Sequence, residues 1–205
     1  MSSSSPLQSP SPSPKLLTGK LHLIIGPMFS GKTTNMLNKL GVLYDTGHKV
    51  VYLNHNIDNR DPDACYSTHS SILSGSVSSF HMKQTDSDLG TLDWDQIVAD
   101  YDVVGIDEAQ FFGRALLDFV EHLVDNNKYV FVSGLNGDFN KNKFGYVLDL
   151  IPKADKINLL SAFCAKCKTL TKAPFSKRIV EGNTDNILVG GSESYIPVCR
   201  EHWVQ

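Results

Sequence analysis

The chain has 205 residues, of which 41% are hydrophobic, and this length and composition fit one ordinary domain with an appendage. Its formal net charge of -3 argues against a protein that coats nucleic acid, because such binding depends on neutralising phosphates with Lys and Arg. The sequence has no apolar stretch long enough for a membrane span and no secretory signal at its N-terminus. We therefore expect a cytoplasmic protein with no nucleic-acid or membrane partner.

Residues 1–17 are rich in Ser and Pro, a composition that cannot bury enough apolar surface to offset the entropy cost of ordering. The sequence therefore predicts a disordered tail here. Its Ser-Pro pairs, such as Ser9-Pro10 and Ser13-Pro14, suit phosphorylation, and a solvated leader without a role explains them equally well.

The remaining elements alternate between short apolar runs and segments with helical spacing. Apolar runs predict strands at 21–25, 49–53, 103–106 and 129–132, and apolar spacing predicts helices at 32–43 and 114–125. Weak periodicity in the Ser/Thr-rich residues 66–90 predicts loop or irregular structure. Continuous apolar strands between helices indicate an α/β fold, with a parallel sheet covered by helices on both faces. We expect an ATP-binding domain over 18–160 and a small second lobe over 161–205, where Pro and Gly turns separate short segments.

A phosphate-loop pattern, G-x-x-x-x-G-K-[ST], spans Gly26 to Thr33 between the first strand and the first helix. In this context backbone N–H groups and the helix N-terminus converge on an anion. The Lys32 ammonium reaches the outer phosphates, and the Thr33 hydroxyl is placed to bind the Mg²⁺ that bridges them. The sequence therefore predicts binding of ATP with Mg²⁺.

Two carboxylates, Asp107 and Glu108, follow directly after an apolar strand. An acid at this point of a phosphate-loop protein lies beside the loop and holds Mg²⁺ through oxygen or water. The second carboxylate can activate a water molecule, as in an ATPase, or a substrate hydroxyl, as in a kinase.

The segment Asp58-Asn59-Arg60 follows the second strand, near the carboxyl end where open parallel sheets bind ligands. Arg60 could stabilise charge on a phosphoryl group during transfer. An exposed Asp-Arg ion pair in a loop explains the segment equally well.

The C-terminal lobe contains two short pairs of metal-type ligands, Cys164 with Cys167 and Cys199 with His202. Together they make a Cys₃His set with the spacing of a tetrahedral zinc site, and four protein ligands leave no open position for catalysis. A redox C-x-x-C pair is the weaker alternative, because it leaves the matching C-x-x-H unexplained. We expect a structural zinc ion and read the remaining cysteine, Cys65, as an ordinary small side chain.

These features together resemble one family, the cytosolic-type, zinc-containing (type II) thymidine kinases. The matching segments follow the order of the family and cover nearly all of the chain after residue 18. They are Gly26 to Thr33, Asp107 to Phe112, Gly137 to Phe139, Lys143 to Gly145, Ser176 to Arg178, Gly190-Gly191, and the set Cys164, Cys167, Cys199 and His202.

The resemblance implies transfer of the ATP γ-phosphate to the 5′-hydroxyl of thymidine, giving thymidine monophosphate for DNA synthesis. Glu108 would be the catalytic base that accepts the hydroxyl proton, while Asp107 would hold magnesium through water. The ATP-binding residues implied by the family are Gly26, Pro27, Met28, Phe29, Ser30, Gly31, Lys32, Thr33, Asp58, Asn59, Arg60, Asp107, Glu108, Ala109 and Gln110.

The family also implies a thymidine pocket in which Phe139 stacks on the base, residues 186–190 donate and accept backbone hydrogen bonds, and Tyr195 closes one side. The implied substrate-binding residues are Met28, Leu135, Phe139, Phe144, Asn186, Ile187, Leu188, Val189, Gly190 and Tyr195. Similarity to the family further suggests a homotetramer that thymidine triphosphate inhibits.

Two other classes of function stay open. An ATPase or helicase would also use Asp107-Glu108, but it needs an arginine-rich surface that the sequence does not suggest. A zinc-ribbon binding module without catalysis would leave the phosphate loop unexplained.

Overall fold

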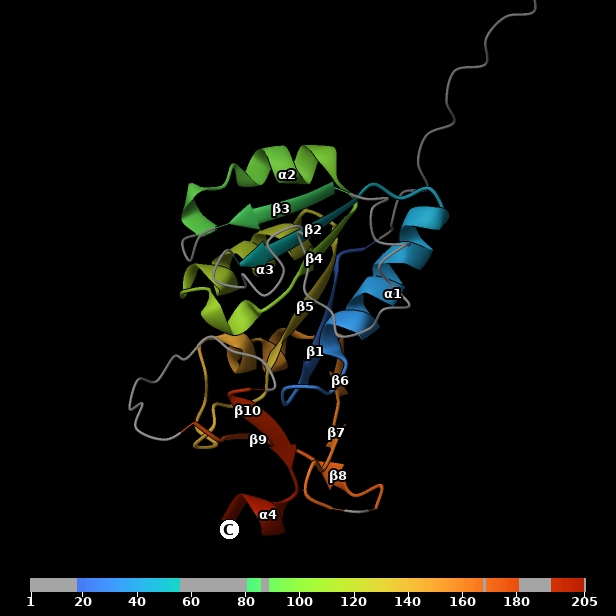
Figure 1. Ribbon diagram of the computed structural model, residues 1–205. Coiled ribbons are helices and arrows are strands. Elements are labelled where there is room, and N and C mark those ends of the chain that lie inside the picture. Colours follow the sequence, from blue (N-terminus) through green and yellow to red (C-terminus); the bar gives the residue numbers. More distant parts are fainter. Residues whose placement is uncertain (1–17, 56–80, 86–88, 168, 181–192, 205) are drawn as a thin grey trace, which may run out of the picture.

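The computed structural model describes residues 18–55, 81–85, 89–167, 169–180 and 193–204 (Figure 1). Several expectations from the sequence lie outside these residues. They concern the disordered tail at 1–17, the Asp58-Asn59-Arg60 segment, Cys65, the substrate-binding stretch 186–190 and the Gly190-Gly191 motif.

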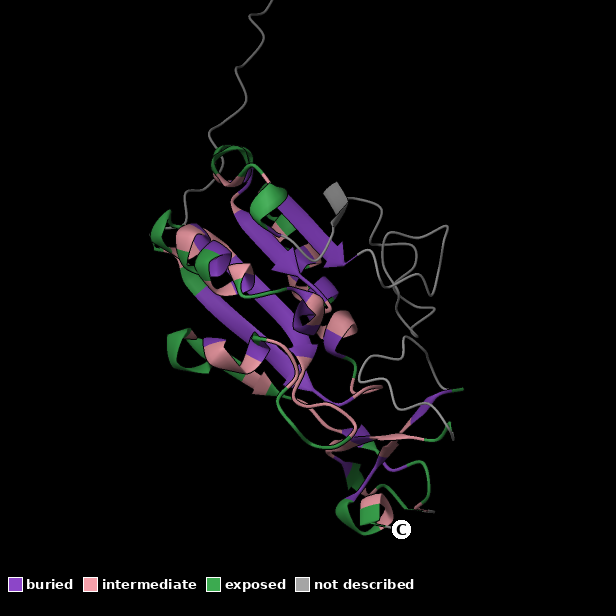
Figure 2. Ribbon diagram, turned by 90° about the vertical axis from the view of Figure 1, so that its left-hand side faces the viewer, coloured by how far each residue is buried: buried purple, intermediate pink, exposed green. Residues whose placement is uncertain are grey.

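The described residues form a six-stranded sheet in the order β3-β2-β4-β5-β1-β6, in which every neighbouring pair is parallel. Strands β1, β2, β4 and β5 are buried almost throughout (Figure 2), as continuous apolar runs require. The strands are β1 (Lys20–Gly26), β2 (Val50–His55), β3 (His81–Thr85), β4 (Val103–Ile106), β5 (Tyr129–Leu135) and β6 (Lys156–Leu159).

Helices cover both faces of the sheet, which confirms the predicted α/β fold (Figure 1). Helix α1 (Lys32–Asp45) packs its apolar side on one face, and α2 (Trp94–Asp100) and α3 (Ala115–Asp125) pack on the other. The buried residues of α3 recur at helical spacing and join the larger core cluster; they are Leu116, Phe119, Val120 and Leu123. Short 3-10 helices complete this part: η2 (Leu89–Thr91), η3 (Ala109–Phe111) and η4 (Val147–Lys153).

The prediction of irregular structure over residues 66–90 was wrong where it can be compared, because β3 lies within it. Strand β3 reads His-Met-Lys-Gln-Thr, which lacks an apolar run, and its parallel pairing with β2 makes it a strand. Helix α2 and strand β6 were also missed. Helix α2 has only seven residues, with Asp93 accepting a hydrogen bond from the Gln96 N–H at its start. Strand β6 lies at the sheet edge and is largely exposed.

The C-terminal part lies beyond the carboxyl ends of β1 and β5 and contains two small antiparallel pairs (Figure 1). Strand β7 (Ala162–Phe163) pairs with β8 (Lys172–Ala173), and β9 (Phe175–Arg178) pairs with β10 (Tyr195–Val198), which leads into helix α4 (Arg200–Val204). Among the described helices, we find none with the length and apolar character needed to cross a membrane.

Candidate active site

The loops that follow β1, β4 and β5 lie together at the carboxyl edge of the sheet, which is the edge formed by the C-terminal ends of its strands. Gly26 at the end of β1 lies opposite Leu135 at the end of β5, and Ile106 at the end of β4 lies opposite Val132 of β5 and Leu53 of β2. The chain therefore leaves β1, β4 and β5 at neighbouring positions. This edge is where open parallel sheets bind ligands.

The phosphate loop has the backbone geometry expected of an anion site. A side chain at Gly26 would place its Cβ 2.8 Å from the Leu160 carbonyl oxygen, so the close approach requires glycine. Gly31 adopts φ 78° just before α1, and no described residue caps this helix start with its side chain or adds an acid to its first turn. The helix N-terminus is therefore available to a phosphate. The Lys32 ammonium donates to the Pro27 carbonyl across the loop at 2.9 Å.

The phosphate loop is hydrogen-bonded directly to Asp107, the first of the two carboxylates that follow β4. The Thr33 hydroxyl donates to Asp107 Oδ2 at 2.7 Å, and the Tyr52 hydroxyl donates to the same oxygen at 2.9 Å. Burial and the neighbouring Glu108 carboxylate raise the pKa of Asp107 above its usual value. A buried carboxylate beside a hydroxyl is a suitable donor set for Mg²⁺, which would stabilise the charged carboxylate.

Glu108 occupies an unusual backbone conformation at the same edge, with φ 48° and ψ 39°. Non-glycine residues rarely adopt this left-handed region, and such strain is concentrated at functional sites. The Gln110 amide donates to Glu108 Oε2 at 2.6 Å. Ala109, between them, is fully buried, and its side chain belongs to the core under η3.

The phosphate loop also contacts the C-terminal part. The Met28 N–H donates to Ser176 Oγ on β9 at 2.9 Å. Phe29, with φ 62°, packs against the small apolar cluster that surrounds Cys164 and Cys199. The donor loop and the C-terminal strands are thus joined by a hydrogen bond and by apolar contact.

Phe139 and Tyr195, two expected pocket residues, both contact Arg178. The guanidinium carbon of Arg178 lies 3.9 Å from the centroid of the Phe139 ring, and Arg178 Nη2 donates to the Tyr195 hydroxyl at 2.9 Å. Trp203 Nε1 donates to the Phe139 carbonyl at 3.3 Å. An open hollow of about 310 Å³ lies here, lined by Phe139, Lys177, Arg178, Val180 and Trp203.

Phe144, a further expected pocket residue, meets Phe111 edge to face, with ring centroids 5.6 Å apart. Phe111 also lies 5.6 Å from the His55 ring. Leu135 is half-buried at the end of β5. Sequence reasoning missed Phe111, although it belongs to the Asp107 to Phe112 segment.

Ser176 and Arg178 were placed in a family motif without a role, and Trp203 was not singled out. Their contacts cross between segments far apart in the chain, so only the folded structure reveals them. The expected residues Asp58, Asn59, Arg60 and Asn186 to Gly190 lie outside the described residues.

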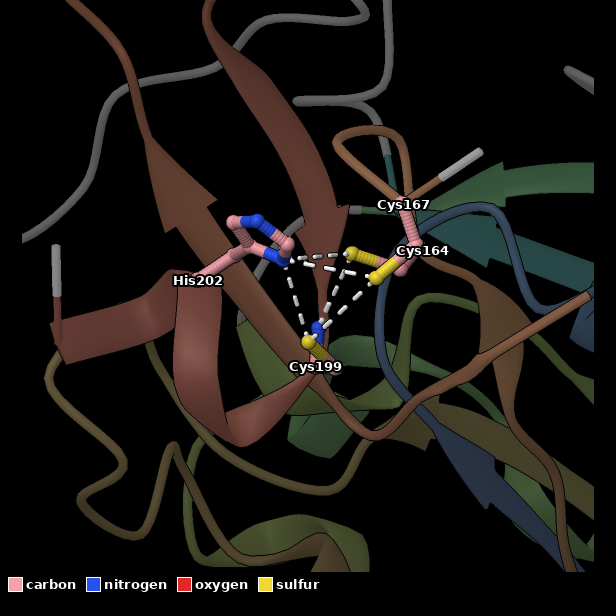
Figure 3. Close-up of side chains that lie close together, drawn as sticks. All are labelled: Cys164, Cys167, Cys199 and His202. Atoms are coloured by element: carbon pink, nitrogen blue, oxygen red, sulfur yellow. Dashed lines mark hydrogen bonds between the residues drawn. The ribbon is translucent and has the colours of Figure 1, made fainter. Parts of the chain in front are cut away.

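The two predicted ligand pairs come together in one cluster. Cys164 and Cys167 lie after β7, Cys199 lies just before α4, and His202 lies on α4; all four side chains point toward a common centre (Figure 3). Their ligand atoms lie within 4.8 Å of one another. His202 Nδ1 is 3.3, 3.4 and 3.7 Å from the sulfurs of Cys199, Cys167 and Cys164, and the Cys167 and Cys199 sulfurs are 3.8 Å apart.

These spacings suit a tetrahedral metal ion. Zinc bonds of about 2.3 Å to sulfur and about 2.0 Å to nitrogen place the ligand atoms of a tetrahedron roughly 3.5 to 3.8 Å apart. Burial of Cys164 opposes its ionisation, but backbone N–H groups, including that of Cys199 at 3.3 Å, outweigh burial and lower its pKa to about 6. The donor set thus has the chemistry and spacing of a closed zinc site.

Comparison with known proteins agrees with this arrangement. The profile of the family described as thymidine kinase matches residues 19–203. A protein of Oryza sativa subsp. japonica named thymidine kinase is 39% identical over 188 residues, which cover 91% of this chain and 66% of the rice protein. Proteins with the same name from Amsacta moorei entomopoxvirus and Thermococcus kodakarensis are 38% and 34% identical; the matches cover 88% and 90% of this chain and 95% and 93% of those proteins.

Proposed function

Since the chain belongs to the thymidine kinase family, we propose that the site at the carboxyl edge of its sheet transfers the γ-phosphate of ATP to the 5′-hydroxyl of thymidine. As a member of this family the chain is a nucleoside kinase, and thymidine is its substrate. The observation that carries the assignment of the site is the adjacency of Glu108 to Asp107, which is hydrogen-bonded to Thr33 of the phosphate loop.

The donor half of the site consists of the phosphate loop and the start of α1. Backbone N–H groups from Phe29 to Thr33 and the uncapped helix start bind the phosphate oxygens, because Pro27 has no N–H and the Met28 N–H donates to Ser176 Oγ. Lys32 exchanges its bond to the Pro27 carbonyl for the outer phosphates. When Mg²⁺ is bound, it neutralises charge between the outer phosphates. Thr33 would bind it directly and Asp107 through water. We assign Asp58, Asn59, Arg60 and Ala109 to the same half on family resemblance.

The chemical step is an in-line displacement. The 5′-oxygen of thymidine attacks the γ-phosphorus of ATP, a new O–P bond forms, and the bond from the γ-phosphorus to the bridging oxygen breaks with its electron pair leaving on ADP. Glu108 accepts the proton of the 5′-hydroxyl and later loses it to solvent. The position of Glu108 at the edge that also carries the phosphate loop supports this role.

The acceptor half lies between the phosphate loop and the C-terminal strands. We propose that the exposed side of Phe139 stacks on the thymine ring, while Tyr195 forms one wall. The contacts of Arg178 with both residues support this pocket. Residues assigned to the other walls are Met28, Leu135, Phe144 and Phe111, with backbone groups of Asn186, Ile187, Leu188, Val189 and Gly190 at the base edge.

We further propose that the cluster of Cys164, Cys167, Cys199 and His202 binds one structural zinc ion. Four protein ligands fill its coordination, so the metal has no open position for substrate. Its part is to hold α4 against β9 and β10, where Lys177 donates to the His202 carbonyl at 3.1 Å. Thiolate ligands persist in a reducing compartment, which is why we propose the cytoplasm as the site of action.

A homotetramer is our proposal for the assembly. Strand β6 forms one edge of the sheet among the described residues, and its Ile157 and Leu159 side chains are 41% and 67% exposed. An exposed apolar edge strand suits pairing with another copy of the chain. Thymidine triphosphate carries both the acceptor nucleoside and a triphosphate, so it would occupy both halves of the site and inhibit.

The experiment that tests this function is ATP consumption by the purified protein with and without a panel of nucleosides. We expect turnover that depends on thymidine and that falls to background without a nucleoside. Strong ATP turnover in the absence of any nucleoside would instead support the ATPase alternative.

A further inference from the structure

Gln110 links the proposed base to the central sheet through both ends of its carboxamide. The Leu135 N–H, at the carboxyl end of β5, donates to Gln110 Oε1 at 3.0 Å, and Gln110 Nε2 donates to Glu108 Oε2 at 2.6 Å. The side chain is buried, with 3% of its surface exposed. One buried amide therefore bridges a strand end and a carboxylate.

The orientation of this amide follows from its partners. A backbone N–H can only donate, so the oxygen of Gln110 must face Leu135 and the NH₂ group must face Glu108. A glutamate in the same place could accept from Leu135 but, when ionised, could not donate to Glu108. The position thus requires a group with an acceptor at one end and a donor at the other.

The strand end that holds Gln110 is the one beside the phosphate loop. Leu135 lies opposite Gly26 in the parallel pairing of β1 and β5, and the Asn136 N–H donates to the Gly26 carbonyl at 3.3 Å. The bridge through Gln110 therefore ties Glu108 to the point from which the phosphate loop begins. Glu108 is thereby held at a defined place relative to the phosphate loop.

The backbone of Gln110 is held as tightly as its side chain. Gly145, with φ 60°, packs against it so closely that a Cβ at this position would lie 2.3 Å from the Gln110 carbonyl oxygen. On the other side, Phe111 N–H donates to the Glu108 carbonyl at 3.1 Å and closes the turn of η3. The neighbouring Glu108 has the left-handed backbone described above, which persists only where its surroundings enforce it.

We propose that Gln110 is a positioning residue, which fixes the carboxylate of Glu108 for proton transfer and does not itself bind ATP. This inference rests on the proposed function of Glu108. It differs from the family-based expectation that Gln110 contacts the donor nucleotide. Both ends of its amide bond to protein, and a direct contact with ATP would compete with these bonds.

The test compares two substitutions that remove different parts of the bridge. Gln110→Glu keeps the shape and the acceptor for Leu135 but replaces the amide donor to Glu108 by a second carboxyl group. That group either is ionised and cannot donate, or shares one proton with Glu108 and so occupies the base. Gln110→Met loses both the acceptor and the donor. Gln96→Glu, on the exposed surface of α2, is the matched control for the change in charge. Thermal unfolding shows that each variant is folded, and kcat, KM for ATP and the Kd for thymidine are then measured.

We expect both Gln110 variants to lose kcat by about 100-fold, because a small misplacement of a reacting group has effects of this size. Their KM for ATP and Kd for thymidine should stay within about twofold of wild type, since binding contacts are unchanged. Gln96→Glu should behave as wild type. If Gln110→Met does not fold, the isosteric Gln110→Glu variant decides alone.

Three results would overturn the inference. A Gln110→Glu variant with near wild-type kcat would mean that only the bond to Leu135 matters, which is a structural role. A raised KM for ATP with unchanged kcat would mean that Gln110 contacts the nucleotide. If Gln96→Glu lost as much activity as Gln110→Glu, the added negative charge alone would explain the loss. Failure of the wild-type protein to transfer phosphate to thymidine is a separate outcome that rejects the proposed function itself.

Discussion

The Met28 N–H donates to Ser176 Oγ at 2.9 Å, although the two residues are 148 positions apart in the sequence. Met28 belongs to the phosphate loop, and Ser176 lies on β9, whose first residue, Phe175, packs against the apolar cluster around Cys164 and Cys199. This bond joins the half of the site proposed to hold ATP to the half proposed to hold thymidine. The fold therefore determines how the two proposed halves of the site lie relative to each other.

Ser176→Ala removes this bond and should weaken thymidine binding. A partly buried hydrogen bond contributes about 1 kcal/mol to the stability of the arrangement that it joins. The Kd for thymidine should therefore rise by up to about fivefold, the limit reached when the whole bond energy serves to hold the pocket in its binding form. Ser176→Thr keeps the hydroxyl and is the matched control. Isothermal titration calorimetry measures both. Equal weakening by the two variants would show that the hydroxyl is not what matters at this position.

Arg178→Ala should also weaken thymidine binding, because Arg178 contacts both Phe139 and Tyr195. The substitution removes cation–π contacts with the rings of both residues and two hydrogen bonds to the Tyr195 hydroxyl. We therefore expect a rise in thymidine KM of about tenfold, with KM for ATP little changed. Lys172→Ala removes an exposed cation–π contact with Phe163 and should leave both values unchanged. A wild-type thymidine KM in Arg178→Ala would contradict the pocket assigned to these residues.

Cys199→Ala should lose the metal and loosen the pocket. Protein purified without chelator should contain about one zinc per chain. The substitution should remove it and raise thymidine KM about tenfold, because Trp203, next to His202 on α4, donates to the Phe139 carbonyl. Cys65→Ala is the control, since the proposed ligand set does not include it. Metal analysis and steady-state kinetics check these results, and wild-type protein without zinc would refute the site.

Zinc affinity should depend on pH through Cys164. Its pKa is lowered to about 6 in the metal-free protein, so the thiolate is present above this pH and takes up a proton below it. Because the proton competes with zinc for this thiolate, the logarithm of the apparent zinc affinity should fall more steeply with decreasing pH below about 6. Below that pH, one additional proton must be released for each zinc ion that binds. Competition with a zinc-binding dye between pH 5 and 8 measures the slope. An unchanged slope across pH 6 would contradict this role.

The sequence predicted the central strands because their side chains are buried on both faces and so read as continuous apolar runs, as in β4. The phosphate-loop pattern and the clustering of the three cysteines with His202 were predictable because each needs particular residue types at a fixed spacing. Strand β3 could not be predicted, because its polar sequence gives no periodic signal and its structure depends on pairing with β2.

The contacts that organise the site were also beyond sequence reasoning. The bridge from Leu135 through Gln110 to Glu108 depends on the register of β4 and β5, which brings two strand ends together. The bond from Met28 to Ser176 likewise depends on where the C-terminal strands pack. Composition and periodicity carry information about local structure, but such pairings arise only from the folded chain.

The measurement that tests the central claim most directly is transfer of labelled γ-phosphate from ATP to thymidine by the wild-type and Glu108→Gln proteins. The wild type should form labelled thymidine 5′-monophosphate. Glu108→Gln should lose about 10² to 10⁴-fold in rate, as expected for loss of a general base, while its Kd for thymidine stays within about twofold of wild type. Near-full transfer by Glu108→Gln, or label released as inorganic phosphate whether or not thymidine is present, would contradict the account.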